Sequence, residues 1–315
     1  MKPKMLIILL ILFLLFAASC RPAEDTEKSK KLHIIATIFP VFDFARNVGG
    51  DKVVVKMLLP PSTDAHNYEL KPEEILKISK ADLFLYINLE MEQWAHKALQ
   101  NASVKTNMLP VEAGKGVTML PSEEVHGDMD QENHHISKFD PHIWLDFDNV
   151  VKMVDNITAA FIEKDSANSD YYRNNAEEYK SKLLALDKRY LSELTGCRNK
   201  VVMHAGHRAF AYLCNRYGIK YFSTHTVSSD SEPEPQKIIT FIRQINNSGT
   251  GYIYFEDLSA PRLAEVIAEE TGAELLKLNN AHNISKKQLA EGISFLDLME
   301  ENLANLKKGM KCPQK

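Results

Sequence analysis

The sequence predicts an α/β protein with two lobes, each a mostly parallel sheet flanked by helices, joined by one long rigid linker helix. Short β-like runs alternate with helical runs after Leu32, and the alternation resumes after residue 197. Between the two series lies a helical stretch without Gly or Pro. Strand–helix alternation at this spacing favours parallel sheets that are covered by helices on both faces. A chain of 315 residues, 44% of them hydrophobic, is long enough for two cores.

The expected domain organisation follows from these changes along the chain. In chain order we expect a lipoprotein signal peptide (1–19), a flexible tether (20–31), an N-terminal α/β lobe (32–165), the linker helix (166–196) and a C-terminal α/β lobe (197–311).

The first residues indicate export across the cytoplasmic membrane. Two lysines precede an unbroken apolar run from Met5 to Phe16, and small residues stand directly before Cys20. This is the layout of a cleaved secretory signal. A cysteine at this place resembles a bacterial lipobox, in which the thiol is acylated, although Ala17 stands where Leu is more usual. We expect an extracytoplasmic protein, periplasmic or at the cell surface, with a lipid anchor on Cys20; an uncleaved single-span anchor is the alternative.

The N-terminal lobe is expected to contain four strands with helices between them. The strand candidates are Leu32–Ile38, Val53–Leu58, Asp82–Asn88 and Val104–Leu109. The helical candidates are Val41–Val48, Pro72–Lys80 and Met91–Gln100, and a proline suits the first turn of the second helix.

The linker helix is predicted over Ser169–Leu194. Its apolar residues recur at helical spacing and share one stripe, and Gly196 ends the pattern. The stripe contains Tyr172, Ala176, Tyr179, Leu183, Leu186 and Tyr190. A rigid helix between the lobes would limit hinge bending, which a Gly/Ser linker would allow.

The C-terminal lobe repeats the alternation. Its strand candidates are Lys200–Met203, Lys220–Ser223, Gly251–Phe255 and Glu274–Leu278. Its helical candidates are His207–Tyr217, Pro235–Asn246, Pro261–Thr271 and Ser285–Lys308.

Three cysteines follow Cys20 and cannot all pair within one chain. Cys214 lies in an apolar helical run and is expected to be a small core residue. Since an oxidising compartment permits a disulfide, Cys197 and Cys312 are the pair to test. The chain has no CxxC spacing, which argues against a thiolate zinc site.

Three histidines follow predicted strands, where open α/β sheets bind ligands. They are His66 in PPSTDAHNYEL, His142 in FDPHIWLD and His207 in HAGHRAFAYL. Three imidazoles that converge would offer nitrogen ligands at roughly 2.0–2.1 Å, which zinc prefers. A single loop histidine is more often a surface residue, so the hypothesis depends on convergence. His204, at the end of an apolar strand, is interpreted as structural or supporting.

Four segments resemble the metal-specific solute-binding proteins of bacterial ABC transporters, the zinc- and manganese-uptake lipoproteins. They read PPSTDAHNYEL, FDPHIWLD, HRAFAYLCNRYGI and YFEDLSAPRLAEVIAEETGAELLKLN, and the resemblance runs from about Leu32 to Lys308. It implies a receptor that captures a divalent metal between two lobes and delivers it to an ABC-type permease with a cytoplasmic ATPase. It maps metal ligands onto His66, His142 and His207. A monomer is expected.

The fourth ligand is where this sequence departs from the family. Members commonly carry an Asp in an LDPLG-like segment, whereas this chain reads LKLNNAHN. We favour His282 as the fourth ligand, with Asn279, Glu256 or water as alternatives.

The ligand types indicate which metal is carried. A histidine rather than a glutamate at position 207 resembles the zinc type of this family, and imidazole suits zinc better than manganese. Zn²⁺ is the expected transported ligand; a manganese (Mn²⁺) or iron receptor of the same family is the alternative.

A second group of histidines lies in the acidic stretch between Pro121 and Asp140. His126, His134 and His135 stand there among acidic residues. In zinc-type relatives a histidine-rich loop at this position is thought to collect metal weakly. The alternative is a solvated loop with incidental histidines.

The remaining function classes are weighed against these residues. A net charge of −4 argues against nucleic acid as the main partner. No HExxH motif occurs, so we expect no enzyme; a zinc-dependent hydrolase is the alternative of another class. A surface adhesin that uses its metal only structurally is a third hypothesis.

Overall fold

The computed structural model describes residues 31–66, 68–102, 107–122, 138–226, 233–256, 261–282 and 284–313. Leu32–Lys315 group into one unit. In these ranges, no helix is both long enough and apolar enough to cross a membrane. Cys20 and the predicted signal peptide lie outside the described residues.

The first lobe is built on a four-stranded parallel sheet in the order β2-β1-β3-β4. Its strands are β1 (Leu32–Ala36), β2 (Val53–Met57), β3 (Leu83–Tyr86) and β4 (Leu109–Glu112). Alternate side chains of a strand point to opposite faces. Ile34 and Leu85 therefore join one core cluster, whereas Ile35 and Phe84 join another on the opposite face.

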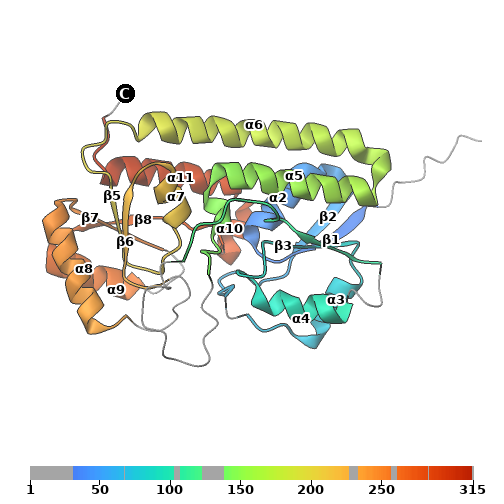
Figure 1. The fold of residues 1–315 in the computed structure, drawn as a ribbon, viewed down its shortest axis with the longest axis horizontal. Coiled ribbons are helices and arrows are strands. Elements are labelled where there is room, and N and C mark those ends of the chain that lie inside the picture. The colour runs from blue at the N-terminus through green and yellow to red at the C-terminus, as the bar shows by residue number, and fades with distance from the viewer. Residues whose placement is uncertain are drawn as a thin grey trace, which may run out of the picture. The chain divides into compact units, whose positions relative to one another are not determined.

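Helices cover both faces of this sheet (Figure 1). One face packs against α2 (Phe39–Gly49) and α5 (Phe147–Lys164), and the other against α3 (Pro72–Ser79) and α4 (Gln93–Ala102).

The second lobe repeats the plan with the strand order β6-β5-β7-β8, again parallel throughout. The strands are β5 (Val201–His204), β6 (Lys220–Ser223), β7 (Tyr252–Phe255) and β8 (Glu274–Lys277). One face packs against α7 (Ala211–Arg216) and α11 (Phe295–Gly309), and the other against α8 (Pro235–Ser248) and α9 (Pro261–Thr271). Two parallel sheets with helices on both faces confirm the predicted fold class.

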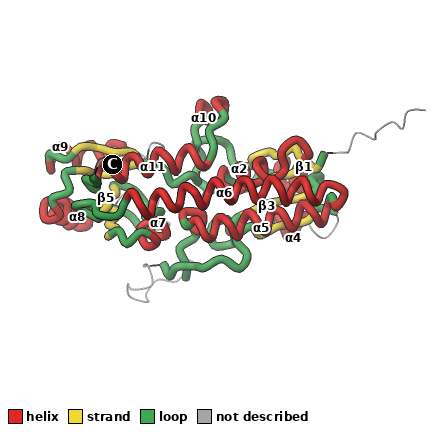
Figure 2. The backbone as a smooth tube through the Cα atoms, turned by 90° about the horizontal axis from the view of Figure 1, so that it is seen from above, coloured by secondary structure: helices red, strands yellow, loops and turns green. Residues whose placement is uncertain are grey.

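The long helix α6 (Ser169–Glu193) joins the lobes (Figure 2). Its predicted apolar stripe is buried. It packs against α5 and α2 of the first lobe and against α11. The core cluster beneath it contains residues of both lobes, and the rings of Phe44 and Phe295 meet edge to face at 5.1 Å. Because the lobes share this core, bending them apart would expose apolar surface at a cost of roughly 25 cal/mol per Å².

An ion-pair network also ties the lobes together. The guanidinium of Arg216 on α7 donates to Asp187 on α6 at 2.8 Å and to Asp146 and Asp148 at the start of α5 at 2.8–3.0 Å. The Tyr217 hydroxyl donates to Asp187 at 2.6 Å. Arg216 is the residue type suited to this place, because its planar fork can donate to several carboxylates at once.

Three helical predictions need correction. The segment Ser285–Lys308 is not one helix but two, α10 (Lys286–Glu291) and α11, because Gly292 takes a left-handed conformation (φ 74°) and Ser294 caps a new start. The helix predicted from His207 begins only at Ala211; the amides of Arg208 and Ala209 bond to Thr226 and His207 in a loop instead. Helix α5, capped by Asp146, was not predicted at all.

The fourth strand also lies later than predicted, at Leu109–Glu112 rather than Val104–Leu109. Pro110 lies within it, and a proline usually argues against a strand. It is tolerated here because β4 is at the edge of the sheet, where one side of the backbone needs no partner.

The cysteine prediction is confirmed. Cys197, after α6, and Cys312, after α11, form a disulfide that closes a loop of 115 residues. Cys214 is a buried free thiol in the core.

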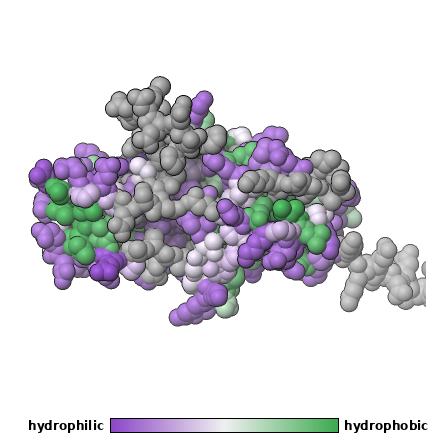
Figure 3. All heavy atoms as spheres, turned by 90° about the horizontal axis from the view of Figure 1, so that it is seen from below, coloured by the Kyte–Doolittle hydropathy of each residue, from purple (hydrophilic) through white to green (hydrophobic). Residues whose placement is uncertain are grey.

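The surface away from α6 exposes apolar side chains on both lobes. Figure 3 shows them gathered over α8 and α9 and over α3 and α4. Ile239 and Val266 belong to the first group and Leu76 to the second, with 44–55% of each residue exposed.

Candidate metal centre

Four histidines approach one another at loops that follow strands. His66 lies in the loop after β2, His207 in the loop after β5, His282 in the loop after β8 and His142 directly before the 3₁₀ turn η3 (Ile143–Leu145). Since the carboxyl ends of parallel strands form a common edge, the topology of each lobe brings its loops to one side.

The His66 loop is held by hydrogen bonds at both ends. The His66 amide donates to Asp64 Oδ1 at 2.7 Å, and the Trp94 indole donates to the Ala65 carbonyl at 2.8 Å. The Ser62 amide donates to the Ile284 carbonyl at 3.1 Å, which connects this loop to the loop that carries His282.

His142 is fixed by Asp140, two residues earlier. One oxygen, Asp140 Oδ1, lies 2.9 Å from the His142 amide and 2.8 Å from the ring Nδ1. Behind the ring lies Trp144, whose ring centroid is 5.4 Å away. The carboxylate orients the imidazole so that Nε2 is left for a ligand, which is the arrangement found around zinc.

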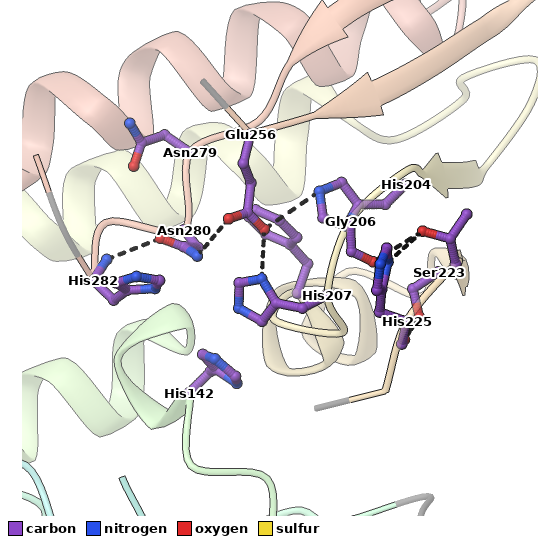
Figure 4. Close-up of polar contacts among 12 residues, drawn as sticks. His142, His204, Gly206, His207, Ser223, His225, Glu256, Asn279, Asn280 and His282 are labelled. Atoms are coloured by element: carbon purple, nitrogen blue, oxygen red, sulfur yellow. Dashed lines mark hydrogen bonds and ion pairs between the residues drawn. The ribbon is translucent and has the colours of Figure 1, made fainter. Parts of the chain in front are cut away.

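His207 has a carboxylate partner in the second lobe, as His142 has Asp140 in the first. Its Nδ1 lies 3.1 Å from Oε1 of Glu256, which follows β7. The same oxygen lies 3.5 Å from Nε2 of the fully buried His204 (Figure 4). Glu256 therefore lies behind His207, and His204 is a supporting residue.

The three predicted histidines converge. The ligand nitrogens of His66, His142 and His207 all lie within 4.8 Å of one another, and the ring centroids are 5.2–5.9 Å apart. Each buried Nε2 has no hydrogen-bond partner. Three nitrogens around a tetrahedral zinc would be about 3.3 Å apart, so a small contraction suffices for coordination.

His282 adjoins this group. Its ring centroid is 5.8 Å from that of His207 and 6.2 Å from that of His66, and its buried Nδ1 has no hydrogen-bond partner. Asn279 points away from the rings of His142, His207 and His282 in Figure 4, and its Oδ1 accepts from the Ala281 amide at 2.7 Å.

Burial keeps several of these imidazoles neutral. Burial and then the neighbouring histidines hold the pKa of His66 well below its usual range. Burial lowers the pKa of His282 to about 4, and that of His204 to about 4. Burial would raise the pKa of Glu256, but His207, His204 and His282 together outweigh it and the pKa falls to about 2. At neutral pH His66 and His282 thus offer uncharged nitrogens beside the carboxylate charge of Glu256, which suits a divalent cation.

Two supporting residues were not predicted from the sequence. Asp140 could have been found, because a carboxylate two residues before a candidate ligand is a local signal. Asn280 could not, because its carbonyl accepts a hydrogen bond of 2.7 Å from the indole of Trp144, 136 positions away. His126, His134 and His135 lie outside the described residues.

Comparison with known proteins gives one family. Residues 34–309 match the model of the family "zinc-uptake complex component A, periplasmic". The chain is 33% identical over 303 residues to the high-affinity zinc uptake system protein ZnuA of Bacillus subtilis, covering 95% of this chain and 94% of that protein. It is 32% identical to the zinc-binding lipoprotein AdcA of Streptococcus pneumoniae over 97% of this chain, but it spans only 60% of that longer protein.

Solved structures agree with this match. The Zn(II)-bound ZnuA-like domain of S. pneumoniae AdcA superposes with a TM-score of 0.76 at 30% identity, covering 89% of this chain and 99% of that chain. The metal-dependent lipoprotein YcdH of B. subtilis gives a TM-score of 0.75 at 31% identity over the same shares.

Proposed function

We propose that this chain, which belongs to the family of periplasmic zinc-uptake component A, is an extracytoplasmic receptor that captures Zn²⁺ between its lobes and delivers it to an ABC-type permease. The observation that carries this proposal is the convergence of His66, His142 and His207 from both halves of the chain, with three buried Nε2 atoms free of hydrogen bonds.

We assign four imidazoles to the metal: His66, His142 and His207 as the compact set, and His282 as the fourth ligand. A rotation of the His282 ring would bring a nitrogen towards the centre, and its Nδ1 has no competing partner. Glu256 is not assigned as a ligand because it lies against Nδ1 of His207. Asn279 is not assigned because its side chain points away (Figure 4).

An all-imidazole set favours zinc over manganese or iron within this family. Manganese prefers carboxylate and water oxygens, whereas nitrogen ligands suit zinc. The two carboxylates, Asp140 and Glu256, contact ligand rings through Nδ1. They would raise the basicity of the imidazoles without adding oxygen to the coordination shell.

A receptor is favoured over a zinc-dependent hydrolase. A catalytic zinc keeps one position for water and needs a base placed beside it. In the proposed site His282 takes the position that water would fill, and Glu256 lies behind His207 rather than at an open position. A hydrolase would instead turn over a chromogenic ester in a chelator-sensitive way, and an adhesin would leave growth under zinc limitation unchanged when its gene is deleted.

The partners follow from the family. We propose a permease with its cytoplasmic ATPase as the recipient of the metal, a lipid on Cys20 as the membrane anchor, and a monomer as the working form. Mass spectrometry of protein from a bacterial membrane fraction tests the lipid, because an unmodified Cys20 would contradict it.

Elemental analysis of protein purified without added metal is the direct test, with one zinc per chain expected. His66→Ala, His142→Ala and His207→Ala should each weaken zinc binding strongly, whereas His96→Ala, at an exposed histidine of α4, is the matched control. Unchanged affinity in two of the three variants would refute the site.

The acidic loop is proposed to collect metal weakly. Deleting Glu123–His135 should leave the tight site intact and remove only weaker additional binding. Titration calorimetry separates the two classes, and loss of the tight site would contradict this role.

A further inference from the structure

Asn280 lies at the point where the metal-bearing loops of the two lobes meet. It is 5% exposed and follows β8, two residues before His282. Three of its polar groups, the side-chain Nδ2 and Oδ1 and the backbone carbonyl, each bond to a different residue of the site. These bonds are to Glu256, the His282 amide and Trp144.

The side chain of Asn280 joins two residues of the second lobe. Its Nδ2 donates to Glu256 Oε2 at 3.0 Å, and its Oδ1 accepts from the His282 amide at 3.0 Å (Figure 4). The other carboxylate oxygen of Glu256 lies 3.1 Å from His207 Nδ1. Asn280 therefore holds the carboxylate that orients His207 and the backbone that carries His282.

The main chain of Asn280 reaches the first lobe. Its carbonyl accepts from the Trp144 indole at 2.7 Å, and the Trp144 ring packs against His142. The donor and acceptor are both buried, so water cannot replace this bond without opening the core.

We infer that Asn280 is a positioning residue for the metal centre: through Glu256 it fixes the ring of His207, and through its backbone it sets the His282 loop against His142. This inference rests on the proposed zinc site and adds a residue that touches no metal. An amide is required because one end must donate to a carboxylate while the other accepts from an N–H.

The isosteric variant Asn280→Asp tests the Nδ2 donor of Asn280 separately from its two acceptors. It keeps an oxygen for the His282 amide and the carbonyl for Trp144, but it removes the N–H that faces Glu256 and places a second carboxylate there. We expect zinc affinity, measured by competition with a chelator of known affinity, to fall by about 10- to 100-fold.

Asn279→Asp is the matched control. The same charge is added one residue away, and Asn279 Oδ1 only accepts from the Ala281 amide, which Asp also allows. Attraction between the new charge and zinc would tighten binding in both variants. Weaker binding in Asn280→Asp alone therefore points to lost positioning.

A double variant reverses the direction of the hydrogen bond between residues 256 and 280. In Glu256→Gln with Asn280→Asp, the new amide can donate to Asp while its oxygen still faces His207 Nδ1. If Asn280 acts through Glu256, the double variant binds zinc as tightly as Glu256→Gln alone, within about twofold, and the two single losses do not multiply.

The Trp144 indole signal in a ¹H–¹⁵N spectrum reports on the loop that carries Asn280 and His282. The chain has two tryptophans, so Trp94→Phe assigns the two indole signals. The Trp144 signal should keep its wild-type shift in Asn280→Asp. A shifted or lost Trp144 signal, an affinity within about twofold of wild type, or multiplied losses in the double variant would each overturn the inference. If wild-type protein itself fails to bind zinc, the proposed function fails instead.

Discussion

Asp43 offers a test of the energetics where the lobes join. This α2 residue is 3% exposed, and one side-chain oxygen, Oδ2, accepts three hydrogen bonds. The donors are the Phe295 amide at the start of α11 (3.1 Å), the Tyr179 hydroxyl of α6 (3.3 Å) and the Asn47 amide group (3.2 Å). Burial outweighs these bonds and raises the pKa of Asp43 from 3.8 to about 6.

The raised pKa has a definite consequence for stability. Between pH 3.8 and about 6 the folded state binds more protons than the unfolded state, so the free energy of unfolding falls as the pH rises through this window. The full cost of burying the charged Asp43 carboxylate is present above about pH 6. The rise of the pKa from 3.8 to about 6 makes this cost about 3 kcal/mol, at 1.36 kcal/mol per pKa unit.

Asp43→Asn removes this penalty and keeps the hydrogen bonds, because an amide oxygen can occupy the place of Oδ2. We expect the variant to be more stable than wild type at pH 8. Its advantage should be about 2 kcal/mol larger at pH 8 than at pH 4.5. Comparing variant with wild type at each pH cancels the opposing titration of the buried histidines, whose pKa values are lowered.

The assay is urea unfolding followed by circular dichroism, with a chelator present so that metal binding does not contribute. Asp170→Asn is the control, because its side chain is 93% exposed and the same change should cost less than about 1 kcal/mol at either pH. A variant less stable than wild type at pH 8, or an advantage independent of pH, would refute the reasoning about burial.

Three further predictions concern the site, the lobe junction and the disulfide. Zinc affinity should fall as the pH drops through the pKa of His207, because protons compete with the metal for imidazole; burial lowers this pKa, but Glu256, Asp64 and Asp140 together raise it above 6.5. Competition titrations that give one affinity from pH 8 to 5 would contradict this. Arg216→Ala should lower the free energy of unfolding by about 2–4 kcal/mol, since the Asp187 side chain, 8% exposed, loses its cation; urea unfolding measures it, and a loss below about 1 kcal/mol would make the network dispensable. Replacing Cys197 and Cys312 by serine should cost about 2–5 kcal/mol because the bridge closes a loop of 115 residues. Equal melting temperatures with and without the bridge would exclude that contribution.

The spacing of apolar residues was sufficient to predict those helices and strands whose position depends on their own apolar pattern. The apolar stripe of α6 and the strand–helix alternation of both lobes were predicted because spacing alone determines which side chains face the core. The predicted bounds were wrong where backbone conformation determines where a helix or strand begins or ends. Nothing in the apolar pattern shows that Gly292 ends α10 at a left-handed residue, or that an edge strand tolerates Pro110.

The residues of the candidate site also fall into those that their own segment predicts and those that it does not. His66, His142 and His207 could be named because each follows a strand or a proline-restricted turn in its own segment. Asp140, which orients His142, is local, but other supporting residues belong to distant segments: Glu256 and Asn280 lie far along the chain from His207 and His142. Such partners are set by how the two sheets face each other, which local sequence does not specify.

Folding of the two lobes brings three candidate ligands together before any metal arrives. Buried nitrogens of His66, His142 and His207 face one another without hydrogen bonds, and each such atom costs roughly 1–3 kcal/mol. The lobes cannot relieve this cost by separating, because α6, the shared core and the Trp144–Asn280 hydrogen bond hold them together. At the proposed site, a cation with a preference for nitrogen would satisfy all of these atoms at once. Part of its affinity would therefore come from a cost already met during folding, which is the physical meaning of preorganisation.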